Sequence, residues 1–220
     1  APAAPVPPAL GLNARDYGAI GEQLCTARVV SRHRPHPDEL PWLTCSGRCS
    51  RAGNGLVDDA PALQRAIDAA QRQNRALLLP AGSYTINATL LVRCCRKGTA
   101  PMVPPLRLIG EGPVQTLIEP GRQMTALIAM TGANDTVLPG PPDKSTAMAE
   151  YHEISQIYLN AKGLADYALL APVLSQGRIA DLKVMGALKA GVRLGGWINT
   201  VIDCSFWGNG VALQLETFNA

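Results

Sequence analysis

Two aspartates and one lysine are the residues of this sequence whose spacing suggests chemistry. Asp181 and Asp203 occupy the same position in two similar segments, and Lys183 follows Asp181 by two positions. If these segments are strands of neighbouring coils, which stack about 4.8 Å apart, the two carboxylates lie side by side on an outer face. Such a pair can hydrolyse a glycoside by acid–base catalysis. It can also bind Ca²⁺ in a lyase that acts on an acidic polysaccharide, and Lys183 is then the candidate base or a clamp for the substrate.

The elements that position these residues are three copies of one alternating pattern. The copies start at Ile154, Ile179 and Val201, which are 25 (179 − 154) and 22 (201 − 179) residues apart. The first, fourth and sixth positions of each copy are apolar, whereas the third and fifth positions are mostly polar. An alternating strand that recurs at a short period predicts a solenoid of stacked coils. The polar positions then face water, and a solvated face is the simpler interpretation of the aspartate column.

Aromatic and metal-ligating residues offer two further possibilities. Trp197 and Trp207 are predicted near coil turns, where they would stack on sugar rings or pack against loops. A zinc site is an alternative for four residues of the first half: His33, His36, Cys45 and Cys49. Disulfides are the favoured interpretation of these cysteines, so the sequence predicts no metal centre there.

The chain is predicted to form one elongated domain preceded by a leader. Residues 1–12 are rich in proline and predict an extended segment. Residues 13–220 predict a single domain, since 47% of the chain is hydrophobic and can bury a substantial core. An insertion rich in Cys, Arg and Pro interrupts this domain at about residues 22–55. Strand and turn patterns resume between residues 76 and 119.

A helix is predicted over about residues 60–73. Pro61 suits its first turn, and Asp58 and Asp59 suit the positive N-terminal end of a helix. An apolar stripe with helical spacing is formed by Leu63, Ile67 and Ala70. We expect this helix to cover one end of the solenoid.

Cysteines and sequons point to an oxidising compartment. The disulfide candidates lie in or near loops of the first half: Cys25, Cys45, Cys49, Cys94 and Cys95. Cys204 falls on the inward side of a predicted strand, where a buried free thiol is expected. Sequons at Asn87 and Asn134 predict N-glycosylation. Together these features predict a secreted protein.

Three N-terminal segments, residues 13–19, 58–67 and 79–84, resemble the N-terminal region of the pectate-lyase-like superfamily, in particular its pectate lyase 3 and tailspike-type domains. That superfamily consists of right-handed parallel β-helices found in polysaccharide lyases, glycoside hydrolases, epimerases and phage tailspikes. The resemblance implies an all-β chain, a right-handed parallel β-helix with a short N-terminal capping α-helix. The insertion between the first two segments departs from the family's pattern.

Catalytic stretches of the family are missing from this sequence. The Asn-Thr-Asp, Gly-His-Gly and Arg-Ile-Lys stretches of the hydrolases are not found, and no histidine follows His152. We therefore expect a secreted glycoprotein β-helix module of a cell surface, extracellular matrix or filament that is associated with carbohydrate. The alternative is a polysaccharide-degrading enzyme, either a lyase or an inverting glycoside hydrolase, that uses Asp181, Asp203 and Lys183. No cofactor is expected, apart from Ca²⁺ if the chain is a lyase.

The net charge and the hydropathy of the chain limit the kinds of partner that it is expected to bind. The net charge is +3 and no long basic stripe is present, which argues against nucleic acid. No apolar run approaches the ~18–20 residues needed to cross a bilayer. The expected ligand is a polysaccharide or another glycan.

The sequence of the C-terminal end predicts a further partner, namely another protein chain. Residues 211–215 form the last predicted repeat strand, and no amphipathic helix or polar cap follows it in this sequence. An uncapped coil exposes apolar side chains and unpaired backbone groups. We expect another protein chain or a second copy of this chain at that coil, unless the sequence is a fragment of a longer β-helix.

Overall fold

The computed structural model describes residues 11–19, 21, 57–93, 104–131 and 149–216. The insertion at about 22–55 lies outside the described residues, as does most of the proline-rich leader. The same holds for Asn134, His33, His36, and the disulfide candidates Cys25, Cys45, Cys49, Cys94 and Cys95. Disulfide pairing, the zinc alternative and glycosylation at Asn134 therefore stay predictions.

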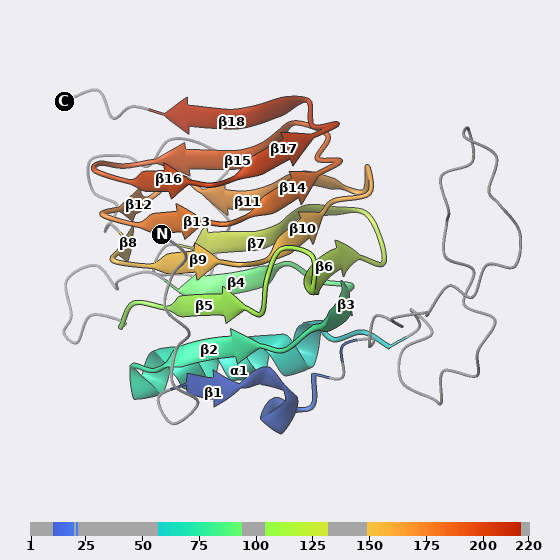
Figure 1. Cartoon of the computed structure of the whole chain (residues 1–220), viewed down its shortest axis with the longest axis vertical. Helices are drawn as coiled ribbons and strands as arrows, with labels where there is room; N and C mark the ends of the chain where they lie inside the picture. The colour runs from blue at the N-terminus through green and yellow to red at the C-terminus, as the bar shows by residue number, and fades with distance from the viewer. Residues whose placement is uncertain (1–10, 20, 22–56, 94–103, 132–148, 217–220) are drawn as a thin grey trace, which may run out of the picture.

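Three parallel sheets build the described structure, and each complete coil contributes one strand to each sheet (Figure 1). Sheet A contains, in spatial order, β1 (Gly11–Asn13), β2 (Ala76–Leu79), β5 (Arg107–Gly110), β9 (Glu153–Ser155), β13 (Arg178–Ala180) and β16 (Thr200–Ile202). Sheet B contains β3 (Gly82–Ile86), β6 (Thr116–Pro120), β10 (Tyr158–Asn160), β14 (Lys183–Met185) and β17 (Ser205–Trp207). Sheet C contains β4 (Leu90–Arg93), β7 (Met124–Thr131), β11 (Ala165–Ala171), β15 (Ala190–Gly195) and β18 (Val211–Glu216). A two-stranded sheet pairs β8 (Ala149–Glu150) with β12 (Leu174–Ser175).

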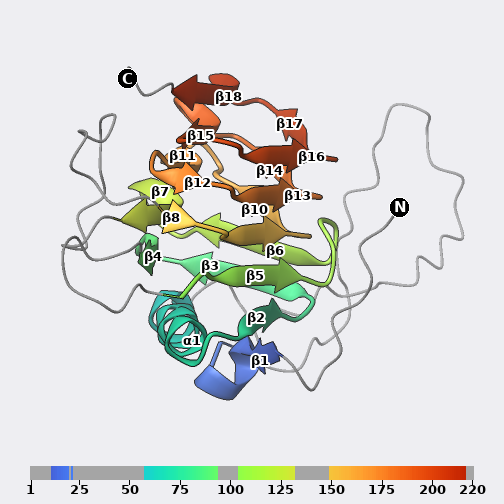
Figure 2. The ribbon, with the colours of Figure 1, turned by 90° about the vertical axis from the view of Figure 1, so that its left-hand side faces the viewer.

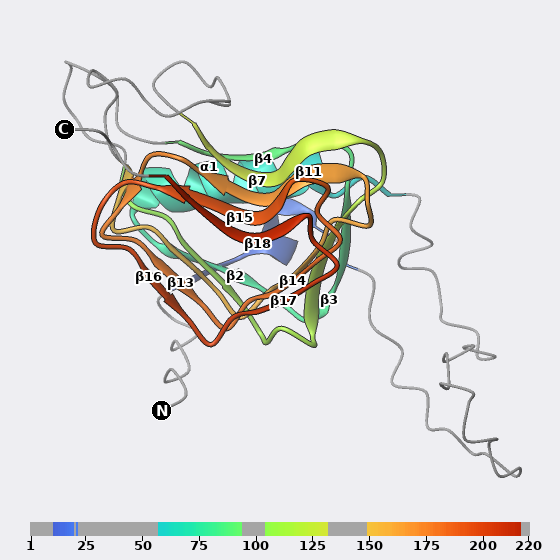
Figure 3. The ribbon, with the colours of Figure 1, turned by 90° about the horizontal axis from the view of Figure 1, so that it is seen from above.

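Seen along its axis, the structure is a three-sided solenoid (Figure 3). Equivalent residues of successive coils pair in register: Ile154 with Ile179, and Ile179 with Val201. Leu159 likewise pairs with Val184. Residues one repeat apart are therefore lateral neighbours, and the predicted right-handed parallel β-helix is confirmed.

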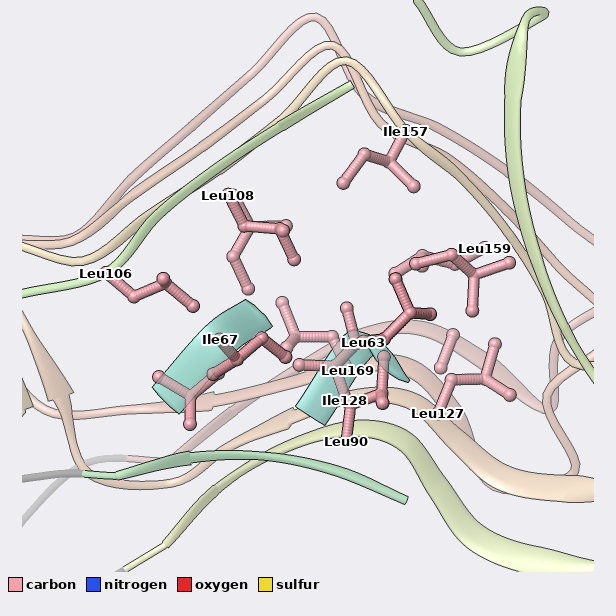
Figure 4. Close-up of a cluster of buried hydrophobic side chains, with 14 of the residues drawn as sticks. Leu63, Ile67, Leu90, Leu106, Leu108, Leu127, Ile128, Ile157, Leu159 and Leu169 are labelled. Atoms are coloured by element: carbon pink, nitrogen blue, oxygen red, sulfur yellow. The ribbon is translucent and has the colours of Figure 1, made fainter. Parts of the chain in front are cut away.

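The apolar positions of the repeat fill the interior of the solenoid. Ile157 and Leu159 have no exposed surface, and the side chains that surround them come from all three sheets and from the helix. Figure 4 shows Leu63, Ile67 and Leu169 within this cluster. Burial of one such side chain contributes about 1.5–3 kcal/mol to folding, so the interior stack is the main source of stability.

The helix α1 (Ala60–Gln73) covers the N-terminal end of the solenoid, over the residues that the sequence predicts (Figure 2). Asp58 is the aspartate that caps it, because Asp58 Oδ1 accepts the N–H of Ala60 at 3.0 Å. The same oxygen accepts the N–H of Asn87 at 2.9 Å and ties the helix to the β3–β4 turn. Asp59 occupies the N-cap position without a side-chain capping hydrogen bond. No helix within the described ranges is long and apolar enough to cross a membrane.

The N-terminal boundary of the solenoid differs from the predicted one. Gly11 and Leu12, expected in the leader, belong to β1 and pair with Ala76 and Leu77 of β2. This added strand supplies backbone partners to the edge of β2, which would otherwise stay unpaired. Sheet A thus begins two residues before the predicted domain.

The eight-residue repeat is not one strand, as its alternation predicts, but two strands joined at a corner. The third position of each copy has a left-handed backbone, with φ of 60° at Gln156, 51° at Asp181 and 53° at Asp203. Most L-residues avoid this region, and aspartate is among the few that tolerate it. A polar residue therefore recurs at this position partly because the chain bends there.

Every regular coil bends at three such corners. The described left-handed corner residues between sheets B and C include Lys162, Gly186 and Gly208, and those that lead back to sheet A are Tyr151, Gln176 and Ile198. Backbone hydrogen bonds stack the corners, for example from Asp181 N to Ile202 O at 3.1 Å. Gly110 lies beneath the Gln156 corner, where an added Cβ would collide with the Gln156 carbonyl. Close stacking at this corner thus requires glycine in the coil below.

The three corners differ in how much their length varies. Two residues separate the sheet A strand from the sheet B strand in all three regular coils. The connection from sheet C back to sheet A spans residues 172–177 in one coil and residues 196–199 in the next. The first corner is therefore constant in length among these three coils, although it spans residues 111–115 between β5 and β6, and the last corner is variable.

His152 is a neutral histidine in the interior of the solenoid. Its side chain is 3% exposed, and its Nδ1 accepts the N–H of Leu106 at 3.0 Å. Burial lowers the pKa of His152 from 6.5 to about 4, because water no longer solvates the charged ring. The unfolded chain therefore takes up a proton below pH 6.5, whereas the folded chain does so only near pH 4.

We predict that acid destabilises the protein through His152. Between pH 6.5 and 4, this histidine lowers the free energy of unfolding by up to about 1.4 kcal/mol per pH unit. Urea unfolding at several pH values measures this loss, with a His152→Asn variant as the control for all other titrating groups. Equal pH dependence of the two proteins would show that His152 is not buried in its neutral form.

Candidate functional site

A cation held between two aromatic rings is the most distinctive feature of the outer face of sheet B. Lys183 lies in register with Tyr158 on one side, and Trp207 belongs to the next strand on the other side. The Lys183 Nζ is 4.7 Å from the ring centroid of Tyr158 and 5.1 Å from that of Trp207. We call Tyr158, Lys183 and Trp207 the aromatic column. It crosses β10, β14 and β17, parallel to the solenoid axis.

The charge of Lys183 has no carboxylate partner within the described part of the chain. The ion pairs of that region use other lysines, such as Lys162 with Glu119 at 2.6 Å and Lys189 with Asp166 at 2.8 Å. Cation–π contacts near the surface contribute about 0.5–1 kcal/mol each, and they leave the positive charge uncompensated. The ammonium group of Lys183 is therefore available to an external anion.

The two rings of the column have different surroundings. Trp207 is half exposed, with 50% of its surface accessible to solvent. Tyr158 is partly buried, and burial raises the pKa of its phenol, with a further contribution from the charge of Glu119. Its hydroxyl lies 3.4 Å from Met185 Sδ. Trp207 thus presents the accessible aromatic surface, and Tyr158 stays a neutral phenol that supports the lysine.

The predicted carboxylate pair lies beside this column at the corner between sheets A and B. Asp181 is half-buried and Asp203 is exposed, at equivalent positions of adjacent coils. Burial raises the pKa of the neighbouring Cys204 thiol, and the negative charges of Asp181 and Asp203 raise it further. Lys183 contacts the aromatic rings and forms an ion pair with neither aspartate.

Cys204 is a free thiol, as the sequence predicts, but it is only half-buried. Its Sγ lies 3.3 Å from Ile202 O and 3.8 Å from Ile179 O. Cys204 belongs to the outermost described coil, where Phe206 and Leu213 are likewise only partly buried. The inward side chains of that coil pack against the coil below on one side only.

The described structure offers no third ligand for a metal ion at Asp181 and Asp203. Among the residues that it places, no three His, Cys, Asp or Glu side chains gather closely enough to hold an ion. Two carboxylates alone fall short of the six to eight oxygen ligands that Ca²⁺ prefers. Ca²⁺ binding at Asp181 and Asp203 stays a prediction.

The remaining predicted residues lie apart from the column. Trp197 is 57% exposed at the corner between β15 and β16, so it does not form one surface with Trp207 at the end of β17. Asn87, the described glycosylation candidate, is half-buried in the β3–β4 turn. The hydroxyl of Thr89, the third residue of that sequon, donates to Ala126 O at 2.7 Å. Attachment of a glycan to Asn87 stays a prediction.

Sheet C carries a polar cluster that the sequence analysis missed. Arg193 is 6% exposed, and its Nη2 lies 2.6 Å from Glu216 Oε1. The ring centroid of Tyr167 is 5.7 Å from Arg193 Cζ and 5.9 Å from Lys189 Nζ. The signal in the sequence was the arginine itself, which interrupts the otherwise apolar strand 190–195. Its partner could not be inferred, because the two residues meet only through the register of β15 and β18.

Comparison with known proteins bears on the fold. No protein-family model and no curated protein matches the chain. The catalytic domain of Agl-KA is similar with a TM-score of 0.58 and 15% identity, over 99% of this chain and 36% of that chain. ORF18 of Geobacillus virus E2 has a TM-score of 0.56 and 13% identity, over 94% of this chain and 40% of that chain. The A-module of the mannuronan C-5 epimerase AlgE6 of Azotobacter vinelandii has a TM-score of 0.43 and 16% identity, over 91% of this chain and 57% of that chain.

This chain therefore spans well under half the length of the first two of these structures. Identities at this level show the architecture and not the activity. The parallel register of three sheets, the capping helix and these likenesses agree on one fold. The chain has the fold of a right-handed parallel β-helix, with a short α-helix that covers its N-terminal end.

Proposed function

We propose that this chain is a carbohydrate-associated β-helix module of a secreted glycoprotein, and that it binds a glycan on the outer face of sheet B. The observation that supports the proposal is the aromatic column, in which Trp207 offers an exposed ring and Lys183 an uncompensated charge. Aromatic rings stack on the apolar faces of sugars, and an ammonium group binds an anion. An acidic glycan supplies both partners.

The aromatic column also predicts the direction in which the glycan runs. Tyr158, Lys183 and Trp207 come from three successive coils, which are spaced about 4.8 Å apart. A sugar that stacks on Trp207 can place a carboxylate near Lys183 on the adjacent rung. The glycan would then run along the solenoid axis and cross the strands of sheet B.

Glycan binding is predicted to depend on Trp207 and Lys183. Titration calorimetry with acidic (oligouronate) and neutral oligosaccharides should show about tenfold weaker binding for Trp207→Ala with both classes. Lys183→Met keeps the length of the side chain and should weaken only the acidic class. Trp197→Ala, which removes an exposed tryptophan from another corner, is the matched control. If Trp197→Ala and Trp207→Ala weakened binding equally, the aromatic column would not be the binding surface.

Secretion and assembly form the second part of the proposal. They rest on the sequons, on the cysteines of the first half, and on the outermost described coil, in which Val211 and Leu215 are exposed. A further coil, from this chain or from another, would cover these residues. End-to-end association of copies is the form of assembly that this surface favours.

Expression in a eukaryotic secretory system tests this second part. We expect mass spectrometry to find a glycan at Asn87, Asn134 or both, and light scattering to find species larger than one chain. Unmodified sequons together with a strictly monomeric protein would contradict it, and would leave glycan binding by the column unaffected.

A polysaccharide-degrading enzyme is the second candidate. It is favoured by one observation, the stacked corners that bring Asp181 and Asp203 to the same place on adjacent coils, with Lys183 two residues after Asp181. One carboxylate would act as acid and the other as base in an inverting hydrolysis, or the pair would hold Ca²⁺ in a lyase.

The enzyme hypothesis predicts loss of activity in an Asp181→Asn and Asp203→Asn double variant. Asparagine tolerates the left-handed backbone as aspartate does, so the corners stay folded and only the charges are lost. Acidic and neutral polysaccharides, with and without Ca²⁺, are the substrates, and release of reducing ends or of unsaturated products is the readout. Activity that survives the double substitution would assign catalysis to another part of the chain.

A further inference from the structure

The ion pair of sheet C has an unusual geometry. Arginine and carboxylate groups commonly pair through both carboxylate oxygens. Here the Nε and Nη2 of Arg193 both donate to Glu216 Oε1, at 2.9 and 2.6 Å, and Gln214 Nε2 lies 3.4 Å from the same oxygen. Three donors therefore converge on Oε1, and the second oxygen is left out.

The oxygen that is left out is buried. Within the described residues, Glu216 Oε2 is the one buried side-chain nitrogen or oxygen without a hydrogen-bond partner. A buried acceptor without a donor costs about 1–3 kcal/mol, and more when it is charged. Such a group is expected to be completed by a donor from outside the chain.

The charges around Glu216 indicate what kind of donor fits. Arg193 and Lys189 supply two positive charges, and Glu216 and Asp166 supply two negative charges, so each cation already has its anion. A further ion would enter this balanced cluster without a counter-charge. A neutral group that donates one hydrogen bond meets the need of Oε2 without disturbing the balance.

The cluster is open to solvent at one side. The side chain of Lys189 is 60% exposed and that of Asp166 is 30% exposed, at the beginning of β15 and β11. Arg193 and Glu216, farther along sheet C, are 8% and 17% exposed as side chains. Tyr167 lies between these two pairs, within 6 Å of both cations. Tyr167 is 9% exposed and Oε2 is closed to solvent, so a ligand reaches Oε2 only when this ring moves aside.

We propose that the outer face of sheet C holds a second binding site, in which a hydroxyl group of a neutral sugar donates a hydrogen bond to Glu216 Oε2 beside the ring of Tyr167. The choice of a sugar as the hydroxyl donor rests on the proposed function. The site itself is separate from the aromatic column, because it uses different strand faces and a different chemistry. It selects a hydroxyl, whereas Lys183 selects an anion.

Nuclear magnetic resonance of the full chain tests this proposal. The Arg193 Nε–H, the ring of Tyr167 and the indole of Trp207 report separately on the two sites. Maltotetraose, cellotetraose, mannotetraose and galactotetraose are the neutral probes, and an oligogalacturonate is the acidic one. We expect at least one neutral probe to shift the Arg193 and Tyr167 signals at millimolar concentration.

Two variants assign the shift to the proposed hydrogen bond. Glu216→Gln keeps an oxygen for Arg193 and replaces Oε2 by an amide nitrogen, so the affinity of the neutral probe at Arg193 should fall about tenfold. Trp207→Ala should leave that affinity unchanged. The spectrum of each variant shows whether it is folded, and Tyr167→Ala is the second variant if Glu216→Gln does not fold.

Three outcomes would overturn the proposal. The first is that no neutral probe moves the Arg193 and Tyr167 signals, which would mean that water alone completes Oε2. The second is that the shift survives in both Glu216→Gln and Tyr167→Ala. The third is that the shift disappears in Trp207→Ala, which would reduce the two sites to one. If the probes shifted only the signal of the Trp207 indole, the proposed function would stand and only the second site would be contradicted.

Discussion

The left-handed corners are the constraint on which the described structure depends. Because each coil bends at the same place, with φ between 51° and 60° at Gln156, Asp181 and Asp203, its strands fall directly onto those of the coil below. Corner hydrogen bonds such as Ser205 N to Leu182 O, at 2.8 Å, maintain this register. The register then decides which residues meet, since apolar side chains stack inside and polar ones form columns outside. Both candidate sites are columns of this kind.

The interior of the fold could be predicted from the sequence, whereas its bends could not. Apolar residues at fixed positions predicted the inward side of Ile157 and Leu182, because only one face of each strand is buried. The corner escaped detection because a single left-handed residue does not interrupt an alternating pattern. Asp181 fits an exposed strand position and a left-handed bend equally well. The helix was predictable to the residue, since its apolar stripe and its N-terminal proline and aspartates are all local signals.

The same limit applies to the candidate sites, where the repeat predicts some neighbours and leaves other contacts undetected. Lys183 was found because it belongs to the repeat, and its register with Tyr158 followed from the alignment of the copies. Its contact with Trp207 is diagonal across two strands, which a repeat alignment does not reveal. Arg193 and Glu216 are 23 residues apart and meet only after the chain has completed a coil. The two faces also differ electrostatically, because sheet B leaves a cation in contact with water and sheet C pairs its charges where water is scarce.

The unequal corners have a consequence for how such a protein can change. The connection between sheets A and B has two residues in the three regular coils and five, residues 111–115, between β5 and β6, yet the strands on either side pair in register. The connection from sheet C back to sheet A already differs in length between neighbouring coils, and the rungs on either side stay aligned. New loops can therefore be acquired at these edges without refolding the scaffold. The loops along these edges could diversify while the backbone of the three sheets stays constant.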